Sequence, residues 1–285
     1  MDAIRRQIDS FWGKFGFCAF DSESRRSISH EPNLVLEIAS TFKLLPMITA
    51  YRQHHDGDID LDAVVTTSKG DHVGGSGILR ELNDDVTTTV RNLIRLMIIL
   101  SDNVATLHVL RRVGVDAANE TAKSLGLPNT CFYAPKADRR GYGTSTPAEL
   151  VQLMTGIVEG TVADPQSCSE MRSILGRQFY LDQIPRFLPV NQYAADIDEE
   201  PAVRVLNKTG FGVGIRSDIA SIEFRGHKPL YLACISNWDQ DDAARRSLLQ
   251  EPASLLHATV ARLAIDSLRP GQLSSPYIPF SERSF

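Results

Sequence analysis

The sequence lacks the features that mark membrane proteins and nucleic-acid-binding proteins. Its apolar runs, such as residues 96–100, are far shorter than the roughly 20 residues that a membrane-spanning helix needs. Lysine and arginine number 30 against 35 acidic residues, for a formal net charge of −5, and no basic cluster stands out. Because phosphate binding needs clustered cations, we expect neither a nucleic-acid partner nor a membrane partner.

Cysteine is scarce, and no histidine lies in a recognisable catalytic motif. The four cysteines, Cys18, Cys131, Cys168 and Cys234, match neither a zinc site nor a CxxC redox pair, so we expect buried free thiols. We predict no metal and no cofactor. No motif places any of the seven histidines as the partner of a serine, so a Ser-His-Asp triad has no support.

A secretion signal is also missing from the given N-terminus, since residues 1–13 contain no apolar core segment. We therefore expect a cytoplasmic protein, or a secreted or periplasmic one whose signal was removed and replaced by Met1. The sequence does not indicate an oligomeric state.

Strand patterns occur near both ends of the chain. Residues 15–20 read as a buried strand, and a second strand is expected at 26–29. Three β-rich segments with short links, at 203–207, 218–224 and 229–236, are typical of an antiparallel meander. The sheet is therefore expected to combine the two ends of the chain.

Helical patterns fill the middle of the chain. Helices are expected at 40–53, 88–100, 104–113, from 147 onward and at 253–268. We predict an α/β fold, an antiparallel sheet flanked by helices, with an inserted all-helical domain. The α/β domain would comprise residues 1–50 and 190–285, the helical domain 51–189, and the active site would lie at their interface.

The first chemical motif is Ser40-Thr41-Phe42-Lys43, at the start of an expected helix. A spacing of three residues places the Ser40 hydroxyl and the Lys43 amine on one face. A serine hydroxyl needs a base to become nucleophilic, and a lysine serves if burial and nearby positive charge lower its pKa. Ser40 is thus the candidate nucleophile and Lys43 the candidate base.

Two further motifs follow, Ser101-Asp102-Asn103 and Lys208-Thr209-Gly210. Ser101 can pass a proton to a leaving group, and Asn103 can bind a substrate amide. Lys208 and Thr209 suit a substrate carboxylate, and Gly210 lets a substrate lie against the strand edge. The backbone amides of Ser40 and Phe211 can form an oxyanion hole.

Each motif alone is a weak signal, but their order and spacing together are specific. They are separated by 61 and then 107 residues, and this combination is the signature of class A β-lactamases and penicillin-binding proteins. The chain resembles a class A β-lactamase from about residue 15 to residue 268. The segments 38–43 and 97–103, which include the first two motifs, and the segment 144–147 resemble family segments.

The resemblance implies a β-lactamase/transpeptidase-like fold and a role for each motif residue. By the resemblance, Ser40 is the nucleophile, Lys43 the general base and Ser101 the proton relay. Asn103 would bind a substrate amide, and Lys208 and Thr209 a substrate carboxylate. Arg216 would be a second carboxylate ligand.

One departure from the family pattern affects the second half of the reaction. Class A β-lactamases carry a loop glutamate that orients the water for hydrolysis of the acyl-enzyme. Here no glutamate lies between Glu120 and Glu149, and Glu81 precedes the second motif. Asp138 is the one acidic residue of the matching loop and the candidate substitute base; its alternative role is a salt bridge to a neighbouring arginine.

Three functions therefore remain open. The chain could be a hydrolase or acyl-transferase that acts on esters, amides or peptides through acyl-Ser40. It could be a true β-lactamase with a different deacylation step. It could also be a penicillin-binding sensor or scaffold that does not turn over. In each case the partner is a small acyl compound.

Overall fold

The computed structural model describes residues 2–71, 73–133, 142–191, 194–197, 199–238 and 250–273. The α-helices are α1 (Asp2–Asp9), α2 (Leu44–Asp56), α3 (Val90–Ile99), α4 (Asn103–Val113), α5 (Val115–Ser124), α6 (Pro147–Glu159), α7 (Pro165–Leu175) and α9 (Gln250–Leu268). The strands are β1 (Lys14–Asp21), β2 (Ser27–His30), β3 (Leu36–Ile38), β4 (Val64–Thr67), β5 (Val86–Thr89), β6 (Cys131–Phe132), β7 (Gly143–Ser145), β8 (Val203–Gly212), β9 (Ile215–Phe224) and β10 (Leu230–Asn237).

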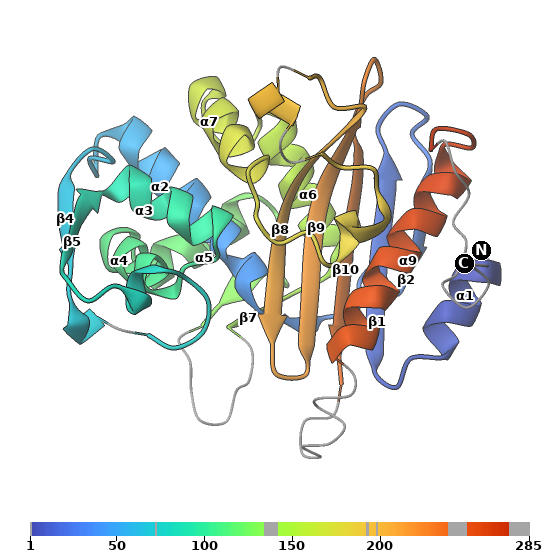
Figure 1. The fold of residues 1–285 in the computed structure, drawn as a ribbon, viewed down its shortest axis with the longest axis horizontal. Helices are drawn as coiled ribbons and strands as arrows, with labels where there is room; N and C mark the ends of the chain where they lie inside the picture. The colour runs from blue at the N-terminus through green and yellow to red at the C-terminus, as the bar shows by residue number, and fades with distance from the viewer. Residues whose placement is uncertain are drawn as a thin grey trace.

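The main sheet combines the two ends of the chain, as predicted. Its five strands run in the order β2-β1-β10-β9-β8, and every neighbouring pair is antiparallel. Helices α1 and α9 lie on one face of this sheet and α6 on the other, while α2 to α5 form a lobe beside the β8 edge (Figure 1). The α/β fold class is confirmed.

Alternation along the strands gives the sheet two apolar faces. On β10, Leu230, Leu232 and Cys234 pack in the cluster that α1 and α9 cover. Tyr231, Ala233 and Ile235 point into the other cluster, which continues without a break into the core of α2 to α7. The sheet and the helical lobe thus share one core; the domain division at residues 50 and 190 remains a prediction.

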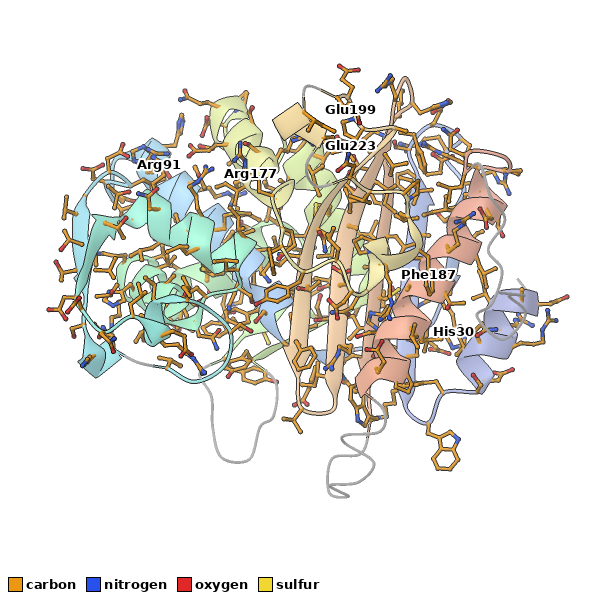
Figure 2. All side chains as sticks on the ribbon, viewed as in Figure 1. His30, Arg91, Arg177, Phe187, Glu199 and Glu223 are labelled. Atoms are coloured by element: carbon orange, nitrogen blue, oxygen red, sulfur yellow. The ribbon has the colours of Figure 1, made fainter. Side chains whose placement is uncertain are left out.

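Ion pairs tie the outer elements of the helical lobe together. Arg91, at the start of α3, binds Asp62 at 2.8 Å and Glu170 of α7 at 2.7 Å (Figure 2). These pairs lie near the surface and contribute little stability individually. Among the described helices, none is long and apolar enough to cross a membrane.

Two expectations about small elements need correction. The helix expected from Ser40 begins as a 3-10 turn, Ser40–Lys43, and becomes α-helical at Leu44. Pro46 explains the difference, because it lacks the N–H that would bond to the Phe42 carbonyl in an α-helix. All four cysteines are free, but Cys18 and Cys131 are only half-buried rather than buried.

Candidate functional site

The candidate nucleophile lies where the sheet meets the helical lobe. Ser40 opens the 3-10 turn that follows β3, and strand β8 passes directly beside it. An ideal Cβ on Gly210 would lie 3.0 Å from the Ser40 backbone nitrogen and 2.2 Å from Ser217 Oγ. Only a residue without a side chain therefore lets β8 approach the Ser40 amide so closely.

Lys43 points into the interior of this junction. Its side chain is buried, and its Nζ donates to the Ser101 carbonyl at 2.6 Å, to Ser101 Oγ at 3.1 Å and to Asn103 Oδ1 at 2.8 Å. Burial lowers the pKa of Lys43 well below that of a free lysine, and the charge of Lys208 lowers it further, while Asp102 opposes the shift. The pKa of the amine is thus shifted in the direction that a general base needs.

The second motif has both a structural and a chemical role. Asp102 is the N-cap of α4 and accepts the backbone N–H groups of Ala105, Ile78 and Leu79 at 2.7–3.0 Å. This fixed carboxylate positions Ser101, whose φ of +54° lies in the left-handed region. Such strain in a non-glycine residue is typical of functional sites.

Both ends of the Asn103 side-chain amide are hydrogen-bonded within the protein. Asn103 Oδ1 accepts from Lys43, and its Nδ2 donates to the Gly74 carbonyl at 2.7 Å. Because Nδ2 carries two N–H groups, a substrate carbonyl could bind the second one without displacing Gly74.

The third motif lies inside β8 rather than at the end of the strand. Lys208 is fully buried and donates to Ser101 Oγ at 3.2 Å and to the Thr209 carbonyl at 2.7 Å. Burial lowers its pKa to about 7, against the opposing effect of Asp218. The two lysines of the motifs thus meet at one hydroxyl, that of Ser101.

Arg216 lies behind the site rather than in it. Its side chain is 1% exposed, its guanidinium carbon lies 3.4 Å from the centre of the Phe211 ring, and it donates to the carbonyls of Gly212 and Ile215. Its role as a carboxylate ligand remains a prediction.

A cavity of about 260 Å³ opens beside Ser40. Its described lining includes four residues that the motifs predicted: Ser40, Ser101, Thr209 and Phe211. It also includes four that sequence reasoning missed: Ser76, Tyr180, Asp182 and Gln183. No local motif marks these four, because they lie in loops that only the fold brings to the β8 edge.

Asp218 is a further residue that the motifs did not reveal. It is fully buried on β9 and accepts the Ile184 N–H at 3.0 Å and the Asn207 amide at 3.3 Å. Burial raises its pKa to about 7. The contact with Ile184 anchors the loop that carries Asp182 and Gln183 to the sheet.

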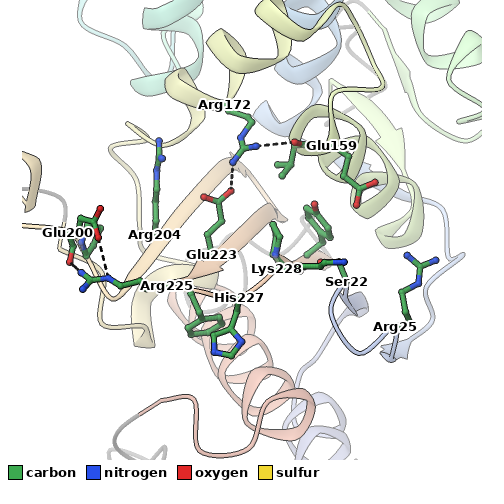
Figure 3. Close-up of a pocket in the computed structure, with 15 residues that line it drawn as sticks. Ser22, Arg25, Glu159, Arg172, Glu200, Arg204, Glu223, Arg225, His227 and Lys228 are labelled. Atoms are coloured by element: carbon green, nitrogen blue, oxygen red, sulfur yellow. Dashed lines mark hydrogen bonds and ion pairs between the residues drawn. The ribbon is translucent and has the colours of Figure 1, made fainter.

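A larger cavity, of about 680 Å³, lies elsewhere on the molecule (Figure 3). Ion pairs cross it, Arg172 with Glu223 at 3.1 Å and Arg225 with Glu200 at 3.5 Å. Its Ser22 hydroxyl donates to the Pro229 carbonyl. Among its described lining residues, no hydroxyl lies beside a buried amine, so it lacks the elements of acyl transfer.

Asp138 falls in residues 134–141, outside the described residues. Among the side chains that are described, no group of three or more histidine, cysteine or acidic residues is arranged to hold a metal ion.

Comparison with known proteins agrees with this geometry. A family model described as the Beta-lactamase enzyme family matches residues 1–260. Beta-lactamase AST-1 of Nocardia asteroides is 25% identical over 268 residues, which cover 90% of this chain and 79% of the relative. Beta-lactamase 3 of Bacillus cereus is 26% identical over 240 residues, which cover 81% and 71%.

Solved structures share the fold. A β-lactamase from Sphaerobacter thermophilus superposes with a TM-score of 0.80 at 24% identity, covering 93% of this chain and 95% of its own. The structure of PBP-A gives 0.79 at 20% identity, covering 94% of both chains. With the family model spanning both the sheet and the helical lobe that enclose Ser40 and Lys43, this chain belongs to the β-lactamase enzyme family and is a serine hydrolase.

Proposed function

We propose that this serine hydrolase forms an acyl-enzyme on Ser40 and turns over esters, amides or peptides more readily than penicillins. The observation that carries the proposal is the buried Lys43 amine, which is hydrogen-bonded to Ser101 and Asn103 one turn from Ser40. Its lowered pKa favours the neutral amine, which is the form that can accept a proton.

The proposed acylation begins with neutral Lys43. Its amine takes the Ser40 proton while Ser40 Oγ bonds to the substrate carbonyl carbon. The backbone amides of Ser40 and Phe211 stabilise the oxyanion. Ser101 then gives its proton to the leaving group, and Lys43 passes the proton that it took from Ser40 back to Ser101, while Lys208 stays hydrogen-bonded to Ser101 Oγ.

Deacylation is the weaker half of the proposed cycle. The family resemblance assigns the hydrolytic water to a loop glutamate, and this chain has none between Glu120 and Glu149. Losing a positioned base typically costs roughly 10²–10⁴-fold in rate. Small acyl groups that leave water access to the ester, or acceptors other than water, fit this site better than bulky β-lactams.

A second function, β-lactamase activity with a different deacylation step, is favoured by the relatives named Beta-lactamase AST-1 and Beta-lactamase 3. In this version Asp138 would be the substitute base. A third version, a penicillin-binding sensor without turnover, would give a stable adduct with every acyl probe.

Intact-mass time courses with penicillin G and with p-nitrophenyl acetate separate these functions. We expect a lasting penicillin adduct alongside continuous p-nitrophenol release. Rapid penicillin hydrolysis without an adduct would favour the β-lactamase. A permanent adduct from both probes would favour the sensor, and no adduct from either would refute acyl-Ser40 chemistry.

A further inference from the structure

Two aromatic residues line the cavity beside Ser40. Phe211 lies near the end of β8, and its side chain is 57% exposed. Tyr180 is half-buried, and its carbonyl accepts the Asn207 side-chain amide of β8 at 3.3 Å, which holds this residue beside the strand. Aromatic side chains at a cavity wall are typical of sites that bind an apolar part of a ligand.

The Phe211 ring is held in place from behind by Arg216. The two residues lie directly opposite each other in the register of β8 and β9, and the guanidinium carbon is 3.4 Å from the ring centre. The guanidinium is itself fixed, since it donates to the carbonyls of Gly212 and Ile215 at 3.1 and 2.8 Å. A ring that is already immobilised loses little conformational entropy when a ligand binds. The rest of the Phe211 ring is therefore a preorganised apolar surface.

This contact also decides which groups β8 offers to a substrate. Arg216 is 1% exposed, so the guanidinium that the family resemblance assigns to a substrate carboxylate is covered by an aromatic ring. Thr209 lines the cavity two residues before Phe211, on the same face of the strand. The substrate carboxylate expected at Lys208 and Thr209 thus keeps its place, and the Phe211 ring adds an apolar contact about 7 Å further along the strand.

The cavity has room for an aromatic group beside a reacting carbonyl. Its volume is about 260 Å³, whereas an apolar cavity of ~150 Å³ is enough to bind benzene. The leaving group is expected to depart toward Ser101, which precedes α4 of the helical lobe, while Phe211 belongs to the sheet. The part of a substrate that faces Phe211 is therefore the acyl group.

We propose that Phe211, together with Tyr180, selects substrates whose acyl group carries an aromatic ring. This inference rests on the proposed acyl-Ser40 chemistry. Two aromatic rings in contact are more stable than burial of their area alone would give, so an aryl group gains more from Phe211 than a saturated ring of the same size.

Three trifluoroethyl esters test this selection with a leaving group that has no ring of its own. The probes are the phenylacetate, which carries an aromatic ring, the cyclohexylacetate, its saturated analogue, and the acetate, which carries no ring. In each, Ser40 Oγ bonds to the acyl carbon, and trifluoroethanol leaves with a proton that replaces the one Lys43 takes from Ser40. The readout is the second-order rate constant of trifluoroethanol release, followed by fluorine NMR and corrected for the rate with hydroxide.

In the wild type we expect phenylacetate to be favoured over cyclohexylacetate by about two- to tenfold, the usual contribution of an aromatic pair. Phe211→Leu keeps an apolar side chain without a ring and should bring the ratio close to one, whereas Phe211→Trp should retain the preference. Val213→Ala is the matched control, because Val213 is 50% exposed in the same hairpin and lies outside the described lining of the cavity. This variant should leave the ratio unchanged.

The outcomes separate the inference from the function beneath it. A wild-type ratio near one, or a preference that Phe211→Leu does not alter, would overturn the selection, while Ser40-dependent release would leave the acyl-enzyme intact. An equal loss of rate with all three esters in Phe211→Leu would indicate a packing role, which also contradicts selection. If Ser40→Ala abolishes no trifluoroethanol release with any ester, the acetate included, both proposals fall.

Discussion

Gly77 tests how the second motif is held in place. Its φ is +124°, and an ideal Cβ there would lie 2.3 Å from Asp102 Oδ2, 2.4 Å from Cγ and 2.7 Å from Cα. Asp102 cannot move aside, because it is fully buried and accepts three backbone N–H groups. Gly77→Ala should therefore push the loop and Asp102 apart.

The cost of Gly77→Ala follows from two contributions. Forcing alanine to a positive φ costs about 1–2 kcal/mol. Disturbing the Asp102 cap of α4 costs about 1–2 kcal/mol more. The sum, about 2–4 kcal/mol, corresponds to a melting temperature lower by roughly 5–15 °C for a chain of this size. Because Ser101 precedes Asp102, acylation should also slow by roughly 10–100-fold.

Urea unfolding, thermal unfolding and p-nitrophenyl acetate burst kinetics measure these effects. Gly57→Ala is the matched control, since Gly57 has a φ of +84° and nothing within 4 Å of its ideal Cβ. It should cost about 1 kcal/mol and leave acylation unchanged. If Gly77→Ala is no more harmful than Gly57→Ala in stability and acylation, Asp102 does not depend on the close approach of this loop.

The remaining predictions concern the chemistry. Ser40→Ala should abolish every mass adduct. Lys43→Ala should slow acylation by roughly 10²–10⁴-fold; if the Lys43→Ala variant acylates within about threefold of the wild-type rate, another group is the base. The acylation rate should rise with pH, because only the neutral amine accepts a proton and the pKa of Lys43 is lowered; a flat profile between about pH 5 and pH 9 would contradict this. Since the charge of Lys208 lowers the pKa of Lys43, Lys208→Ala should move the profile to higher pH and Lys208→Arg should not. With penicillin G, acylation should outrun hydrolysis, so that intact-mass measurements detect an accumulating adduct; rapid penicillin turnover without an adduct would defeat this prediction. If Asp138 is the substitute base, Asp138→Asn should slow hydrolysis and leave acylation unchanged.

The fold was predictable where periodicity is strong. The strands expected at 15–20, 203–207 and 218–224 all occur and are longer than expected, and the strand expected at 229–236 occurs one residue later, at 230–237. The helix expected from 147 onward begins at Pro147, and Thr146 caps it, with its side chain accepting the Glu149 N–H at 3.1 Å. Local patterns fixed these elements because alternation and capping act within a few residues of chain.

The site was predictable only in part, because some of its residues are brought in by tertiary structure. Ser40, Ser101 and Thr209 stand in motifs and line one cavity. Asp182 and Gln183 join them because Asp218 bonds to the Ile184 N–H, a contact between residues 34 positions apart. The burial of Arg216 behind Phe211 could not be predicted from the sequence either, because it depends on the Phe211 ring stacking on the Arg216 guanidinium across the hairpin between β8 and β9.

The hydrogen bonds at Ser101 give a physical basis for its expected relay role. A serine hydroxyl has two acceptor lone pairs and one proton. Lys43 and Lys208 donate to Ser101 Oγ at 3.1 Å and 3.2 Å, so both lone pairs are used. The hydroxyl proton must then point away from both amines, and Ser101 lines the cavity beside Ser40. With both amines as donors, the Ser101 proton is directed toward this cavity, which is consistent with the relay role proposed for Ser101.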